Sequence, residues 1–72
     1  MAAVYIEPRP KGRPEGTPIE DYVVEDDADH ILHVAETQQQ AIDWAKRDGR
    51  RPHVARVRHL NNKRVSDHWR EA

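Results

Sequence analysis

A chain of 72 residues without a cysteine has room for one domain with one thin hydrophobic layer. Such a core supplies no more than about 3–5 kcal/mol, so chains of this size often rely on an oligomer, a metal or a disulfide. The absence of cysteine removes the disulfide and suits a reducing cytoplasm. No segment reaches the roughly 18 apolar residues of a membrane span. We therefore expect a single cytoplasmic domain over residues 1–72 that does not enter a membrane.

The formal net charge of −1 hides an asymmetry between the two halves of the chain. Residues 1–36 carry three basic and nine acidic side chains, whereas residues 37–72 carry nine basic and four acidic ones. In one interpretation the halves fold against each other and the charges lie on solvated strand faces. In the other, the basic residues share one face and bind an anion. The sequence leaves both interpretations open.

The first half of the chain is rich in β-forming segments. AVYIE, at residues 3–7, predicts a strand, and the prolines and glycines of residues 8–18 predict a mobile loop without regular structure. IEDYVVED predicts a second strand and HILHVAE a third, with DDAD as the turn between them. The second and third strands should therefore form a hairpin.

Alternation along these two strands predicts which side chains face the core. In the second strand Tyr22 and Val24 share one face and Val23 lies on the other. In the third strand, regular alternation places Leu32 and Val34 together, and we assign this pair to the core.

A helix is predicted between Thr37 and Gly49. Thr37 and Gln40 have the spacing of a capping box, and Gly49 stands where a left-handed C-terminal cap is expected. Between them lies an apolar stripe at helical spacing, formed by Ala41, Ile42, Trp44 and Ala45. We expect Trp44 to supply most of the buried area of this helix.

Two further strands are predicted after the helix. In HVARVRHL, at residues 53–60, alternation separates two faces, and we assign to the core the set His53, Ala55, Val57 and His59. NNK is typical of a hairpin turn, and RVSDHW should return as a last strand, at residues 64–69. Trp69 is expected to pack under the helix, with an exposed position on the surface as the alternative.

The expected order is therefore strand, strand, strand, helix, strand, strand. This order predicts an α+β fold in which one helix covers one face of a small antiparallel sheet of four to five strands. The open edges and the uncovered face of such a sheet favour a partner or a second copy of the chain.

The chemistry of single residues points away from catalysis. Ser66 is the only serine, and it lacks the sharp strand-to-helix turn of a serine nucleophile. His30 and His33 have H-x-x-H spacing, which on a strand directs the two rings to opposite faces. We therefore expect no catalytic residue, no metal ion and no cofactor, and a protein that is not an enzyme.

Basic residues cluster after the helix and are the candidate contacts with an anion or a partner. They are Arg50, Arg51, Arg56, Arg58, Lys63 and Arg64. Arg56 and Arg58 alternate onto one strand face, which would suit a nucleic-acid backbone. The isoelectric point near 6.5 and the few aromatic residues are less typical of a nucleic-acid-binding domain.

Three segments carry a resemblance to known proteins. The opening VYIEPRP, the helix TQQQAIDWAKRDG and the following VARVRHLNNK are similar in order and spacing to a family of small uncharacterised bacterial proteins. The likeness is best over residues 37–65 and implies a fold of this type without an assigned activity. The strand-strand-strand-helix-strand order also resembles the HicB-type antitoxin domain, a degenerate RNase H-like module that binds a toxin.

From these observations we expect a bacterial, non-enzymatic accessory module that binds a protein partner, either another copy of itself or a different protein. A homodimer would add buried surface to the thin core. The alternative function is nucleic-acid binding through the basic strand after the helix.

Overall fold

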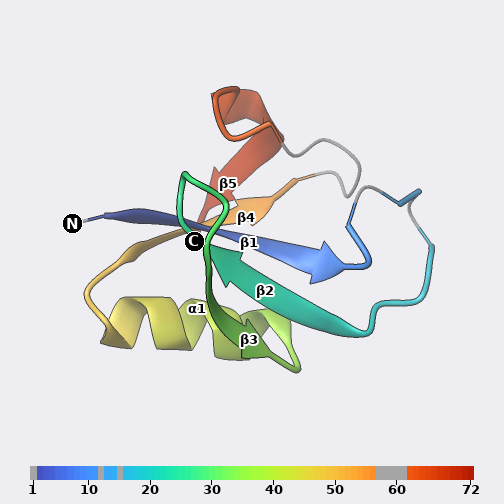
Figure 1. The fold of residues 1–72 in the computed structure, drawn as a ribbon, viewed down its shortest axis with the longest axis horizontal. Coiled ribbons are helices and arrows are strands. Elements are labelled where there is room, and N and C mark those ends of the chain that lie inside the picture. The colour runs from blue at the N-terminus through green and yellow to red at the C-terminus, as the bar shows by residue number, and fades with distance from the viewer. Residues whose placement is uncertain (1, 12, 15, 57–61) are drawn as a thin grey trace.

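The computed structural model describes residues 2–11, 13–14, 16–56 and 62–72. It contains a sheet and one α-helix (Figure 1). The strands are β1 (Ala3–Arg9), β2 (Asp21–Glu25), β3 (Ile31–Ala35), β4 (Arg51–Ala55) and β5 (Trp69–Glu71); the helices are α1 (Gln38–Arg47) and the short 3-10 helix η1 (Ser66–His68). The α+β class and the order of the elements agree with the sequence prediction. No helix in the described ranges has the length and apolarity needed to cross a membrane.

The sheet is mixed, and its strand order is β3-β2-β1-β4-β5. Neighbouring strands are antiparallel except β1 and β4, which are parallel. The expectation of a wholly antiparallel sheet is therefore wrong at one pair. The reason lies in the connection, because α1 carries the chain from β3 across the sheet to β4, and a helical crossover of this kind joins strands that run in the same direction.

The hydrophobic core lies between α1 and one face of the sheet. Its buried residues are Val4, Ile6, Val24, Ala35, Ala41, Ile42, Ala45 and Val54. Val54 is only 3% exposed, so the prediction that His53 and Ala55 face the core is wrong. Pairing with β1 determines which residues of β4 face the core, because Val54 lies opposite the core residue Ile6 and His53 lies opposite Tyr5.

An irregularity in β3 explains why only one of the two residues of this strand that were predicted to face the core does so. Val24 pairs with His33 and Glu25 pairs with Ile31, so Leu32 is an extra residue between two paired ones. A bulge of this type interrupts the alternation of side chains. Leu32 packs against the core as predicted, whereas Val34 is exposed on the other face.

The helix has the predicted ends. The backbone N–H of Gln40 donates to the Thr37 hydroxyl at 3.1 Å, and the Gln40 side chain accepts from the N–H of Glu36. At the other end Gly49 has a φ of 73°, and the N–H of Arg50 reaches back to the carbonyl of Ala45. The buried helix residues are Ala41, Ile42 and Ala45, whereas Trp44, expected to bury the most area, is only partly buried.

β1 extends two residues beyond the predicted start of the proline-rich loop, because Pro8 and Arg9 pair with β2. The Arg9 carbonyl accepts from the N–H of Glu20 on the β2 side, so the ring nitrogen of Pro8 is directed away from β2. On that other side the pairing with β4 has already stopped at Ile6. The proline therefore costs the sheet no hydrogen bond.

The end of the chain departs from the prediction. Residues 66–68, expected in a strand, form η1, and β5 is limited to Trp69–Glu71. Trp69 is buried, but it contacts Tyr5 on the face of the sheet that α1 does not cover, so the expected position under the helix is wrong. In Figure 1, η1 and β5 lie at the end of the molecule away from α1. The predicted core positions Val57 and His59 lie outside the described residues.

Candidate functional site

Strand β3 forms one edge of the sheet, and no described strand pairs with its outer side. Among the five strands in the described part of the chain, β3 alone contains no Asp, Glu, Lys or Arg. The opposite edge, β5, has three residues, of which Arg70 and Glu71 are charged. Short and charged edges resist pairing with another chain, whereas a longer uncharged edge invites it. The outer side of β3, here called the β3 edge, is therefore the edge open to a partner.

Two large apolar side chains of β3 are in contact with solvent. Ile31 is 57% exposed and Val34 is 42% exposed. Both lie on the face of the sheet opposite α1, because they align with Glu25 and Val23 in β2. A partner strand paired with β3 would carry side chains onto this face and cover both residues.

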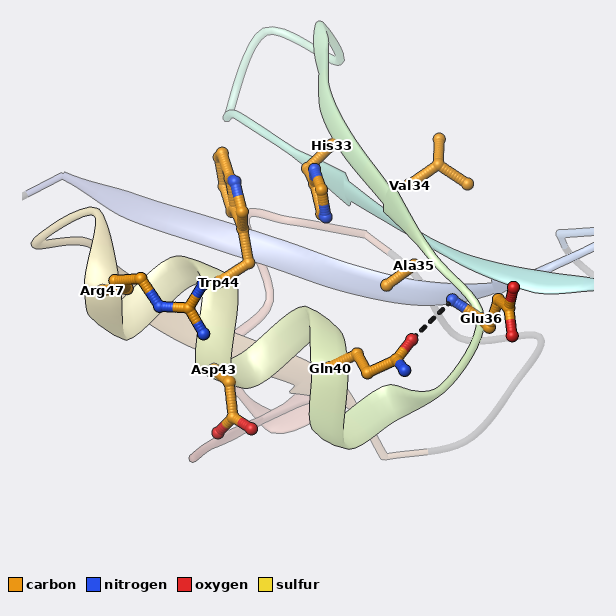
Figure 2. Close-up of a pocket in the computed structure, with 8 residues that line it drawn as sticks. All are labelled: His33, Val34, Ala35, Glu36, Gln40, Asp43, Trp44 and Arg47. Carbon is orange, nitrogen blue, oxygen red and sulfur yellow. Dashed lines mark hydrogen bonds between the residues drawn. The ribbon is translucent and has the colours of Figure 1, made fainter.

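A groove of about 490 Å³ lies on the other face, between β3 and α1. It is lined by His33, Val34, Ala35, Glu36, Gln40, Asp43, Trp44 and Arg47, with the Val34 side chain pointing away from His33 and Trp44 (Figure 2), and we call it the β3–α1 groove. The rings of His33 and Trp44 are stacked at its wall, with centroids 4.7 Å apart and an interplanar angle of 1°. The guanidinium of Arg50 lies 6.0 Å from the centre of the Trp44 ring. The wall is thus an aromatic surface to which β3 contributes His33 and α1 contributes Trp44.

The polar residues of the groove carry different charges. The Gln40 side chain is held by the N–H of Glu36, and Asp43 accepts a hydrogen bond from Gln39 at 2.9 Å. Arg47 forms no ion pair with any residue in the described ranges. The groove therefore offers an acidic side chain, an amide and an available cation beside its aromatic wall.

The predicted contact residues do not share one face of the molecule. Arg50 lies over Trp44 on the helix side and forms an ion pair with Asp48 at 2.6 Å. Lys63 lies over the ring of Tyr5, on the side that α1 does not cover. Arg51, at the start of β4, forms an ion pair with Glu71 of β5 at 2.8 Å.

The other three predicted contacts are also separated. Arg56 lines a hollow of about 350 Å³ together with Pro8, Ile19 and Tyr22. Arg64 lines a more polar hollow of about 310 Å³ with Asp27 and Asp29. Arg58 lies outside the described residues.

The sheet face opposite α1 carries an ionic cluster in which two buried glutamates, Glu7 and Glu25, pair with Lys63 and with the more exposed Lys11. The glutamates are 2% and 3% exposed, respectively. Lys11 bridges them, with its Nζ 2.7 Å from Glu25 and 3.3 Å from Glu7. The Nζ of Lys63 donates to the other oxygen of Glu25 at 2.9 Å and to the carbonyl of Asp26 at 2.7 Å. Oε1 of Glu7 has no hydrogen-bond partner in the described part of the chain.

Both lysines of the cluster are held in the charged form. Burial alone would lower the pKa of Lys63, but its hydrogen bonds to Asp29 and Glu25 outweigh that effect and raise it. The pKa of Lys11 is raised against burial in the same way by Glu25 and Glu7. Because a lysine must lose its proton to act as a base or nucleophile, this arrangement suits a structural role.

Sequence reasoning missed both the ionic cluster and the β3 edge. No local signal marked the first, since Glu7 and Glu25 follow apolar residues in their strands as solvent-facing side chains do. Their partners Lys11 and Lys63 could not be recognised without the strand order. The uncharged composition of β3 was visible, but its edge position also depends on that order.

Within the described residues, no three His, Asp or Glu side chains converge in a way that could hold a metal ion. Comparisons with protein-family models, with curated proteins and with solved structures gave no match. The resemblances to small bacterial proteins and to the HicB-type domain therefore stay predictions.

Proposed function

We propose that this chain is a non-enzymatic protein-binding module of the bacterial cytoplasm that accepts an extended, uncharged segment of its partner along the β3 edge. One observation carries the proposal: the only uncharged strand among those described is also an unpaired edge strand. Addition of a strand to such an edge is a common way of binding peptides, because the main chain supplies the affinity.

The two faces of β3 give this binding its selectivity. Side chains of an added strand point alternately to the two faces of the sheet. Those on one face would contact Ile31 and Val34, which are exposed there. Those on the other face would enter the β3–α1 groove, beside the stacked rings of His33 and Trp44. A partner segment with apolar or aromatic side chains on both faces fits this surface best.

The charges of the molecule favour a protein segment over a nucleic acid. Nucleic-acid binding depends on several cations directed at phosphates from one surface. Here Arg50 and Lys63 lie on different sides of the sheet, and Arg51 is paired with Glu71. No cation lies within β3 itself.

The proposal is tested by titrating the labelled chain with a short blocked peptide, STVIVTS, and recording backbone amide shifts by NMR. The matched control is STVPVTS, in which the central proline removes a donor and disfavours strand pairing. We expect shifts at Ile31–Ala35 and at Trp44 with the first peptide and none with the second. Shifts located elsewhere, or no shifts at millimolar peptide in a sample that light scattering shows to be monomeric, would show that the β3 edge is not a binding site.

A further inference from the structure

We propose that the partner strand is β3 of a second copy, so that two chains join edge to edge into one continuous sheet. This inference rests on the proposed function, because it names the occupant of the same β3 edge. It concerns only the identity of that occupant, so it can be wrong while the proposed function is correct.

The absence of acidic and basic residues from β3 is the first argument for a second copy. In a two-fold symmetric interface the same patch is used by both chains, so each residue lies close to its own counterpart. Like charges placed opposite each other across paired strands are destabilising. Every described strand except β3 carries at least one acidic or basic residue, so β3 is the strand that can meet itself without this repulsion.

The exposed apolar residues supply the second argument. Ile31 and Val34 lie on the same face of β3, so two-fold pairing brings the pairs from both chains together on one face of the joined sheet. Removing such side chains from water is favourable in proportion to the apolar area covered. For a chain with so thin a core, the joined sheet adds buried surface that the single chain lacks.

The geometry limits the size of the assembly. Pairing of β3 with β3 uses up the open edge of each chain, and among the described strands it leaves the short, charged β5 edges at the two ends of the joined sheet. The assembly therefore stops at two copies. Pairing of β3 with β5 would instead leave one open β3 edge after every addition and would produce longer chains.

The test is the mass of the full chain, measured by light scattering and by sedimentation equilibrium from about 5 µM to about 1 mM, a range that covers weak association. Three proteins are compared: the wild type, Val34→Lys and Val65→Lys. Val65 is a matched control, because it is 38% exposed against 42% for Val34 and lies outside β3. Amide NMR spectra confirm that each variant is folded.

We expect the wild-type mass to rise with concentration and to level off at two copies of the 8.4 kDa chain. Val34→Lys should raise the dissociation constant at least about tenfold, because it places like charges next to each other across the two-fold axis. Val65→Lys should dimerise like the wild type.

Three results would overturn the inference: a wild-type monomer at about 1 mM, unchanged dimerisation of Val34→Lys, or masses that continue past two copies. The peptide titration separates these from a failure of the proposed function. If the chain is a monomer and binds STVIVTS at Ile31–Ala35, the β3 edge is still a binding site and only the second copy is ruled out as its occupant. If the chain is a monomer and does not bind the peptide, both proposals are ruled out.

Discussion

The ammonium group of Lys63 lies 2.9 Å from a carboxylate oxygen of Glu25, a residue 38 positions earlier in the chain. Only 11% of the Lys63 side chain and 4% of the Glu25 side chain are exposed. The pair ties the turn after Asn62 to the end of β2, on the sheet face that α1 does not cover. Ion pairs therefore cover part of this face of the sheet, whereas apolar side chains cover the face under the helix.

Replacing Lys63 with methionine should destabilise the protein strongly. The change keeps most of the side-chain volume but leaves one oxygen of Glu25 buried without a cation, while Lys11 still holds the other oxygen. Breaking a buried pair by removing one partner typically costs about 3–5 kcal/mol, and we expect a loss of about 3 kcal/mol. Urea unfolding at one low protein concentration measures the loss without a contribution from association.

Lys46→Met is the matched control for this variant. Lys46 is exposed in the last turn of α1 and contributes only through the helix dipole, so its loss should cost less than about 1 kcal/mol. Equal losses of stability in the two variants would show that the Lys63 contacts contribute no more than an ordinary surface lysine.

The stability of the protein should fall in acid because several native carboxylates have lowered pKa values. The hydrogen bond from Lys63 lowers the pKa of Asp29 below its ordinary value of 3.8, and the guanidinium of Arg9 does the same for Asp21. The unfolded chain then takes up protons first as the pH falls. The contribution of these carboxylates to the free energy of unfolding is therefore complete above about pH 5 and is lost as the pH drops through the native pKa values.

The Asp29→Asn variant checks this prediction. Asp29 has a φ of 66°, a conformation that asparagine adopts readily, so the backbone should tolerate the change. Urea midpoints measured from about pH 7 to about pH 2 should decline less steeply in the variant than in the wild type. Identical pH profiles would mean that the contact between Lys63 and Asp29 does not contribute to stability in solution.

Gly49→Ala should destabilise the end of the helix through the backbone alone. A Cβ at this position would meet no atom within 4 Å, but the φ of 73° is unfavourable for alanine. We expect a cost of about 1 kcal/mol in chemical unfolding. Gly49→Asn should cost clearly less, because asparagine tolerates the left-handed conformation. Equal costs for the two variants would contradict this explanation of the cap.

The two tryptophans should report different parts of the molecule. Trp69 is 6% exposed and donates a hydrogen bond to the carbonyl of Asn62, whereas Trp44 is only partly buried at the β3–α1 groove. In Trp69→Phe, which retains only Trp44, acrylamide quenching should decrease when STVIVTS is added or the protein is concentrated. In Trp44→Phe, quenching should stay low throughout. A decrease confined to Trp69 would place binding near β5, at the opposite edge of the sheet from β3.

Local signals in the sequence were sufficient for several elements. Thr37, Gln40 and Gly49 defined both ends of α1, and DDAD defined the turn of the β2–β3 hairpin. These features depend on residues a few positions apart, where hydrogen bonds and φ preferences act directly. The faces of β2 followed from alternation because that strand has no extra residue before Glu25.

The errors concern contacts between distant segments. The parallel pairing of β1 with β4 joins residues 48 positions apart, such as Ala3 and Arg51, and no local pattern encodes it. The wrong assignment of Val34 came from the bulge, and that of Val54 from the unknown register with β1. The β3 edge could not be recognised as a binding edge without the strand order, although its composition was plain.

The order of the elements along the chain determines which strands can pair first during synthesis. Strands β1, β2 and β3 follow one another and can pair as soon as Ala35 has left the ribosome. At that stage neither face of the young sheet is covered, because α1 and the segment that carries Lys63 have yet to emerge. A chain that ended before Lys63 would still contain every buried residue of the core under α1, because the last of these is Val54. It would lack one of the two lysines that pair with Glu25, so the segment after residue 62 serves the glutamates on the other face of the sheet rather than this core.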